Sequence, residues 1–158
     1  MSQEPKITII TVCFNSIKTI RDTISSIRAQ DYENIEYIVI DGGSSDGTVD
    51  IIKENLDIID YYISETDKGI YDAMNKGILV AKGDIIGILN SDDFYPNQFI
   101  ISNVIKSFKS ENCDAVYGDL VYVDEKNTKE IVRYWKAGKY NTTKIKNGWM
   151  LPHPTFFV

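Results

Sequence analysis

The chain has 158 residues, of which 43% are hydrophobic and 25% charged, a balance typical of one soluble globular domain with a buried core. Its formal net charge of -6 argues against nonspecific binding to nucleic acid, because neutralising phosphates requires a basic surface. The first residues lack the charged and apolar regions of a signal peptide, and no apolar stretch is long enough to span a membrane. Two cysteines are too few for a disulfide framework, so we expect a cytoplasmic protein in a reducing environment.

Strands and helices are expected to alternate through the first half of the chain. Apolar runs rich in β-branched residues predict buried strands, and isoleucines at helical spacing after Ser16, which can serve as an N-cap, predict a helix. In chain order we expect strand 6–12, a helix after Ser16, strand 35–40, helix 48–55, strand 58–64, helix 70–81 and strand 85–89. This alternation predicts an α/β fold, with a Rossmann-like, mostly parallel sheet flanked by helices and right-handed crossovers.

The second half of the chain is expected to be less regular. Pro96 opens a further predicted helix, and shorter strands are predicted over 115–117, 121–123 and 129–135. The sequence finishes in an apolar, strand-like run from His153 to Val158, with no helix stop or polar cap. Because a domain rarely ends within a strand, we expect the sequence to be a fragment of a longer protein.

Three of the predicted strands end in residues suited to binding a ligand. These segments are 13–15, 41–43 and 90–93. Ligands of parallel sheets bind beyond the carboxyl ends of the strands, so the three segments are expected to meet although they lie far apart in sequence. This convergence is stronger evidence for a binding site than any of the three motifs alone.

Asp92 and Asp93 are adjacent carboxylates at the point where the apolar run 85–89 ends. Two like charges side by side are costly unless a cation neutralises them, and hard divalent cations prefer oxygen ligands. One carboxylate would then bind the metal and the other a ribose hydroxyl, and the metal would make a diphosphate a better leaving group. The alternative is that both acids cap the following helix, whose dipole favours negative charge at its start.

Three further residues near the predicted strand ends have chemistry suited to a nucleotide. Asp41 can accept the ring N–H of a uracil or bond a ribose; alternatively, it only forms the turn before two glycines. Phe14 can stack on a base, although packing in the core is the more frequent role of such a residue. Lys68 can reach a phosphate or a base carbonyl, although a single lysine is usually solvated. The chain has no GxGxxG dinucleotide fingerprint.

His153 is the only histidine and lies between two prolines in the apolar tail. A lone histidine is usually structural. If the tail folds over the carboxylate pair, however, the imidazole becomes a further metal ligand or a donor to phosphate.

Taken together, four segments resemble glycosyltransferase family 2, and especially bacterial enzymes that build surface polysaccharides. They are IITVCFNS, the run from Gln30 to Tyr32, IEYIVIDGGSSDGT and DKGIYDAMNKGILVAKGDIIGILNSDD. Their order and spacing are specific, and the similarity covers about residues 5–158. The resemblance implies a GT-A fold, a nucleotide-diphospho-sugar donor, dependence on Mn²⁺ or Mg²⁺, and transfer with inversion to a saccharide or lipid-linked acceptor. A lipid-linked acceptor would bring the protein to the inner face of the membrane as a peripheral protein.

The resemblance also assigns roles to particular residues. The segment Ser91-Asp92-Asp93 matches the DxD element of the family, so that Asp92 contacts the ribose and Asp93 the metal. Asp41 matches the acid that binds the base, and Phe14 matches an aromatic residue that stacks on uracil. Lys68 lies in a segment that often supplies a basic residue to the base or phosphates. The backbone that runs along the base belongs to Thr11, Val12 and Cys13.

One element of the family is not found. We expect a single domain over 1–158, with a nucleotide-binding part over about 5–95 and part of the acceptor side over 96–158. The family's general base, usually an acid that deprotonates the acceptor hydroxyl, follows the segment that contains His153, and neither Asp119 nor Asp124 matches its motif. We therefore expect the base beyond Val158, and expect this chain to bind nucleotide and metal but to transfer sugar poorly.

Two other function classes stay open on the sequence. A noncatalytic nucleotide-sugar binding module would differ from a transferase by lacking a base in the acceptor half. A sugar nucleotidyltransferase would be expected to have a glycine-rich, basic loop after the first strand, where this chain has Phe14-Asn15-Ser16-Ile17.

Overall fold

The centre of the molecule is a four-stranded sheet, seen in a computed structural model that describes residues 4–158 apart from the side chain of Lys144. The strand order is β3-β2-β1-β4, and every pairing is parallel. The predicted parallel sheet is therefore confirmed. The strands are β1 (Ile7–Cys13), β2 (Ile35–Asp41), β3 (Tyr61–Ser64) and β4 (Ile85–Ile88).

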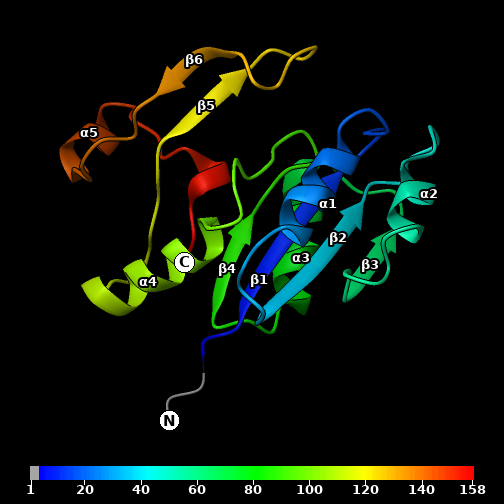
Figure 1. Ribbon diagram of the computed structural model, residues 1–158, viewed down its shortest axis with the longest axis horizontal. Coiled ribbons are helices and arrows are strands. Elements are labelled where there is room, and N and C mark those ends of the chain that lie inside the picture. Colours follow the sequence, from blue (N-terminus) through cyan, green and yellow to red (C-terminus); the bar gives the residue numbers. More distant parts are fainter. Residues whose placement is uncertain (1–3) are drawn as a thin grey trace.

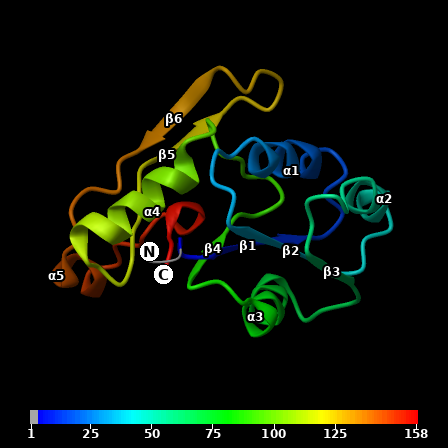
Figure 2. The same ribbon diagram turned by 60° about the horizontal axis from the view of Figure 1, so that its bottom comes forward.

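Helices cover both faces of this sheet. Figure 2 shows α1 and α2 on one face and α3 on the other. The apolar residues of α4 join the same core as those of α1 and α2. None of the helices within residues 4–158 has the length and apolar character needed to cross a membrane. The helices are α1 (Ile20–Arg28), α2 (Thr48–Lys53), α3 (Ile70–Val80) and α4 (Ile100–Glu111).

The two central strands are buried on both faces because their side chains alternate between two cores. Ile9 and Tyr37 enter the core shared with α1, whereas Ile10 and Ile38 enter the core beneath α3. Burying such a side chain contributes about 1.5–3 kcal/mol. The continuous apolar runs of the sequence are thus explained by burial on both sides of the strand.

A second, smaller sheet stands apart from the first (Figure 1). It consists of β5 (Leu120–Val123) and β6 (Ile131–Trp135), which pair antiparallel with an irregularity between Tyr122 and Val123. The side chains of β6 are exposed from Ile131 through Tyr134. The chain then forms α5 (Thr142–Lys146) and a short 3-10 turn, η1 (His153–Thr155).

The last residues return to the edge of the parallel sheet beside β4. The backbones of Val158 and Ile86 exchange two hydrogen bonds, of 2.7 and 3.0 Å, and those of Phe157 and Val116 exchange two more, of 2.8 and 2.9 Å. The ring of Phe157 packs on Gly87, where an added Cβ would lie 2.5 Å from Cε1 of that ring. A larger residue at Gly87 would therefore displace the tail from the sheet.

Some predicted boundaries are wrong. The helix expected after Ser16 begins at Ile20, because the Ser16 carbonyl accepts the Ile20 N–H in a preceding turn. The helix expected from Pro96 begins at Ile100. The strand expected over 115–117 is reduced to a single bridge between Val116 and the tail.

Candidate functional site

The structure brings together the three strand ends that the sequence singled out. Cys13 at the end of β1 is aligned with Asp41 at the end of β2, and the Gly42 N–H donates to the Cys13 carbonyl at 2.9 Å. Beyond β4, the Ser91 N–H donates to the Val12 carbonyl at 3.3 Å. The segment that contains the two aspartates therefore lies directly beside the end of β1.

The loops that follow β1 and β2 are locked to each other by side chains. Asn15 adopts a left-handed backbone with φ of 50°; its N–H donates to Ser44 Oγ at 2.7 Å, and its Oδ1 accepts the Ser45 N–H at 3.0 Å. The Ser16 N–H donates to Thr48 Oγ1 at 2.8 Å. These contacts hold the backbone around Phe14 in a defined position at the edge of the sheet.

Phe14 and its neighbours on β1 differ sharply in exposure. The side chains of Thr11, Val12 and Cys13 are buried, and the carbonyls of Val12 and Cys13 accept N–H groups of neighbouring segments, whereas the side chain of Phe14 is 64% exposed. Core packing, the alternative for Phe14, is therefore wrong. An exposed aromatic ring on a fixed backbone is suited to stacking on a flat ligand.

Asp41 is fully buried and its carboxylate organises the loop that follows β2. Oδ2 accepts the Gly43 N–H at 3.1 Å, the Ser44 N–H at 2.9 Å and the Ser64 hydroxyl at 2.6 Å, and Oδ1 accepts the Ser44 hydroxyl and the Cys13 thiol. Burial acts to raise the pKa of Asp41, but these hydrogen bonds outweigh it and hold the pKa below its ordinary value. In this structure the carboxylate is directed at the loop, and contact with a base remains a prediction.

Asp67 is an acid near Phe14 that sequence reasoning missed. A Cβ added to Gly42 would lie 2.7 Å from Asp67 Oδ2 and 3.4 Å from Phe14 Cδ2, so the carboxylate and the ring approach the same point. The neighbouring Lys68 is exposed, and among residues 4–158 no ion pair engages its ammonium group. Asp67 stands beside Lys68 and after a predicted strand, and this position in the sequence could have indicated that it lies near the site.

The carboxylate pair beyond β4 has no compensating cation among the side chains that the structure describes. Asp93 is partly buried and Asp92 exposed, and no ion pair within the described part of the chain involves either. Burial, and then repulsion from Asp92, raises the pKa of Asp93 to about 6. The helix-capping alternative is wrong, because α4 begins only at Ile100, after Phe99, with no side-chain cap.

This arrangement fits a divalent cation that a ligand also coordinates. A partly buried carboxylate beside a second one is destabilised as an anion, and a hard cation relieves that repulsion. The described residues contain no group of three or more His, Cys, Asp or Glu side chains able to hold a metal by themselves. Asp93 is thus suited to a cation such as Mg²⁺ or Mn²⁺, which is bound through one or two carboxylates plus the phosphates of a substrate.

Two further contacts surround the carboxylate pair. The hydroxyls of Ser16 and Ser91 lie 2.7 Å apart and join the loop after β1 to the segment after β4. Asn90 Nδ2 lies 2.9 Å from His153 Nε2, so the tail does reach the end of β4, as the sequence analysis allowed. The sequence did not predict the contact between Ser16 and Ser91 or the role of Asn90, because each contact joins residues more than sixty positions apart.

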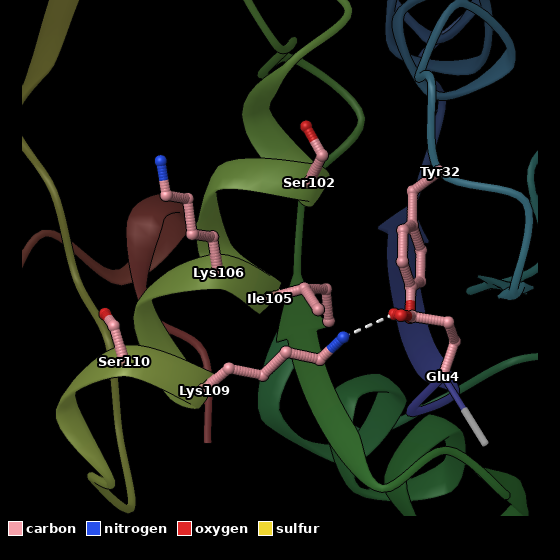
Figure 3. A pocket seen from close by; sticks show the side chains of 7 residues that line it. All are labelled: Glu4, Tyr32, Ser102, Ile105, Lys106, Lys109 and Ser110. Carbon is pink, nitrogen blue, oxygen red and sulfur yellow. Dashed lines mark hydrogen bonds and ion pairs between the residues drawn. The ribbon is translucent and has the colours of Figure 1, made fainter. Parts of the chain in front are cut away.

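A cavity of about 440 Å³ lies at the other end of the sheet. It is lined by α4 and by Glu4 and Tyr32, which precede β1 and β2, and Lys109 closes part of it through an ion pair with Glu4 (Figure 3). Because it is at the amino ends of the strands, it is separate from the residues described above.

Comparison with known proteins defines the class. The model of glycosyl transferase family 2 matches residues 8–157, and the chain belongs to that family. Over 112 residues the chain is 37% identical to a Mycobacterium tuberculosis protein named as an uncharacterized glycosyltransferase, covering 70% of this chain and 43% of that protein. It is 40% identical over 89 residues to poly-β-1,6-N-acetyl-D-glucosamine synthase of Staphylococcus aureus, covering 54% of this chain and 21% of that enzyme. The chain thus spans less than half the length of these relatives.

Solved structures show that the fold is GT-A, as the resemblance implied. A mannosyltransferase from Pyrobaculum calidifontis superposes with a TM-score of 0.67 at 23% identity, covering 81% of this chain and 38% of that one. The S. aureus protein TarS superposes with a TM-score of 0.64 at 22% identity, covering 70% of this chain and 34% of that one.

Proposed function

We propose that the chain is the donor-binding part of a glycosyltransferase that acts in cell-surface polysaccharide synthesis. The whole enzyme would transfer a sugar from a nucleotide-diphospho-sugar, most readily a UDP-sugar, to a saccharide or lipid-linked acceptor with inversion. Residues 5–95 would bind the donor, and residues 96–158 would contribute to the acceptor side. A lipid-linked acceptor would bring the protein to the inner face of the membrane.

The carboxylate pair is the observation that carries this proposal. Asp93 is a partly buried acid whose pKa is raised to about 6 by burial and by Asp92, and it lies beyond β4, the strand paired with β1, after which the exposed ring of Phe14 follows. That combination is suited to a ligand that has both a cation-bound diphosphate and a flat base.

The relatives support the donor and the cation. One is named for a polymer of N-acetylglucosamine, TarS has been solved with UDP-GlcNAc, and the mannosyltransferase with GDP-Man and Mn²⁺. These ligands belong to those proteins, and the inference to this chain rests on shared family and fold.

The proposed roles are those that the family resemblance implies, and the position of these residues beyond the strand ends supports them. Asp93 and His153 would hold the cation, Asp92 the ribose, and Phe14 the face of the base. Lys68 would approach the base or the phosphates, and the buried Asp41 would support the loop that borders them. A bound divalent cation supplies neutralisation of the charge that develops on the leaving diphosphate.

Calorimetric titration of UDP, with and without Mn²⁺, tests this proposal in the wild type and in Asp93→Ala. We expect binding that requires the metal and weakens by more than about tenfold in the variant, as for other disruptions of metal sites. Asp114→Ala, which removes an exposed acid after α4, is the matched control and should bind like the wild type. Equal binding by Asp93→Ala, or no binding of UDP, GDP or dTDP under any metal condition, would contradict the proposal.

A further inference from the structure

The contact between Asn90 and His153 joins two segments that are distant in sequence at the edge of the candidate site. Asn90 lies just beyond the end of β4 and two residues before Asp92, and its Nδ2 is 2.9 Å from His153 Nε2. Figure 1 shows the red turn that contains His153 close to the carboxyl end of β4. The imidazole is thereby held beside Asn90, in the segment that leads from β4 to the carboxylate pair.

The backbone of this turn is fixed independently of Asn90. Val158 pairs with Ile86, and the ring of Phe157 fills the space over Gly87, so the tail is anchored along β4. The His153 side chain itself is exposed, and packing alone does not fix the orientation of its ring. The hydrogen bond to Asn90 supplies that orientation.

The other end of the Asn90 amide gives a second, independent observation. Asn90 Oδ1 is buried and has no hydrogen-bond partner among residues 4–158. A buried polar atom without a partner is unfavourable. An apolar side chain at position 90 would avoid that cost, so packing does not explain the amide. The reason available here is the bond that its exposed end makes to the imidazole.

The hydrogen bond also selects which imidazole nitrogen is free. Asn90 engages Nε2, which leaves Nδ1 without a partner in the described contacts. A histidine that binds a metal uses one nitrogen as ligand and donates the N–H of the other to a neighbouring oxygen, which fixes the ring. The two ends of an amide have the same shape, so Asn90 can present its oxygen to an Nε2–H by a half-turn of the amide.

We infer that Asn90 is a positioning residue, which accepts the His153 Nε2–H and leaves Nδ1 as the nitrogen for the cation or a phosphate of the donor. This inference rests on the proposed function, because it requires a diphosphate and a cation beside Asp93. The inference adds two things to the proposed function: a role for Asn90, and the choice of Nδ1 as the imidazole nitrogen that faces the donor.

Nitrogen NMR of the imidazole tests the inference directly, because the chain has a single histidine and hence one imidazole spin system. In the ligand-free wild type at neutral pH we expect the nitrogen shifts of an imidazole that is protonated at Nε2 and unprotonated at Nδ1. On addition of UDP and Mg²⁺ the Nδ1 resonance should move while Nε2 stays protonated. Asn90→Ala should move the nitrogen shifts toward a mixture of the two tautomers, and Asn90→Asp, which keeps an oxygen in place, should restore protonation at Nε2. Asn147→Ala, an exposed asparagine after α5, is the control.

The outcomes separate the inference from the proposed function. An unchanged imidazole spectrum in Asn90→Ala, or a response at Nε2 instead of Nδ1, overturns the role of Asn90 even where calorimetry shows metal-dependent binding of UDP. Protonation at Nε2 that depends on Asn90, in a protein that binds no nucleotide with any metal, overturns the proposed function and with it the assignment of Nδ1 to the donor. Circular dichroism of both Asn90 variants shows whether they fold.

Discussion

The two sheets of this molecule are built from similar residues but in different environments. β1 is buried along its whole length between helices on both faces, whereas β6 exposes the side chains of Ile131, Val132 and Tyr134. The same apolar residue type is therefore part of the stabilising core in the first sheet and part of the surface in the second. The comparison predicts that stability and donor binding reside in the parallel sheet, and that β5 and β6 contribute little to either.

The largest expected difference comes from the same substitution in each sheet. Ile9→Ala should lower the free energy of unfolding by about 2–5 kcal/mol, because it leaves a cavity in the core beside α1. Ile131→Ala removes the same atoms from a residue that is 58% exposed, and should change the free energy of unfolding by less than about 0.5 kcal/mol. Urea unfolding at neutral pH measures both. Similar losses of stability in the two variants would contradict the view that stability resides in the parallel sheet.

Removing the charge of Asp41 should have the next largest effect. Asp41→Asn should cost about 1–3 kcal/mol at neutral pH, because buried donors of the loop lose a charged acceptor. The folded pKa of Asp41 lies below its ordinary value, so this stabilisation is present above about pH 3.9 and is lost as the pH falls through the folded pKa. Urea unfolding at several pH values should show the difference between the two proteins shrinking in acid. Asp119→Asn, an exposed acid that accepts the Ala137 N–H beside β6, should cost less at neutral pH.

Phe14 and Tyr134 are matched exposed aromatics on the two sheets, at 64% and 55% exposure. Phe14→Ala should weaken UDP binding by about 1–3 kcal/mol, the usual contribution of stacking on a base, with little change in stability. Tyr134→Ala should leave UDP affinity unchanged. Calorimetry on both variants checks this, and an equal loss in both would remove Phe14 from the donor site.

The smallest expected effect is a gain in stability. Burial and Asp92 raise the pKa of Asp93 from 3.8 to about 6, so the folded protein retains a proton that the unfolded chain releases between these pH values. Wild-type stability therefore falls as the pH rises through this range, and Asp93→Asn lacks that fall. The ligand-free variant should be more stable at neutral pH by about 1 kcal/mol, an amount reduced from the full shift because solvent reaches the group. Denaturation at pH 4 and pH 7.5 without metal measures the difference in stability between the variant and the wild type. A variant that is less stable at pH 7.5 would show that the Asp93 anion is not destabilised in the folded protein.

The parallel sheet was predictable because its signals are local. The apolar run over 35–40 predicted β2 within one residue of its observed end at Asp41, and alternating strands and helices predicted the pairing. Boundary errors arose where a short local turn took the place of the expected strand or helix. The strand expected to begin at residue 58 begins at Tyr61, because the Ile58 N–H turns back to the Asn55 carbonyl.

The candidate site was only partly predictable, because only some of its residues are placed by local signals. Asp92, Asp93 and Phe14 follow strands directly, so their place at the sheet edge follows from the topology. The contacts of Ser16 with Ser91 and of Asn90 with His153 depend on how distant loops meet, and no spacing in the sequence encodes them. The inward orientation of the Asp41 carboxylate was hidden because its partner Ser64 comes from another strand.

The bridge between Val116 and Phe157 has a consequence for how such a chain can diversify. Everything between these two residues, including β5, β6 and α5, leaves the parallel sheet and returns to it at one point. A closed excursion of this kind can be lengthened at small entropic cost, about 0.6 kcal/mol for each doubling, without disturbing the strands that anchor it. The part of the excursion that holds β5, β6 and α5 can thus vary in length or sequence, while the turn with His153 and the strands of the parallel sheet are kept.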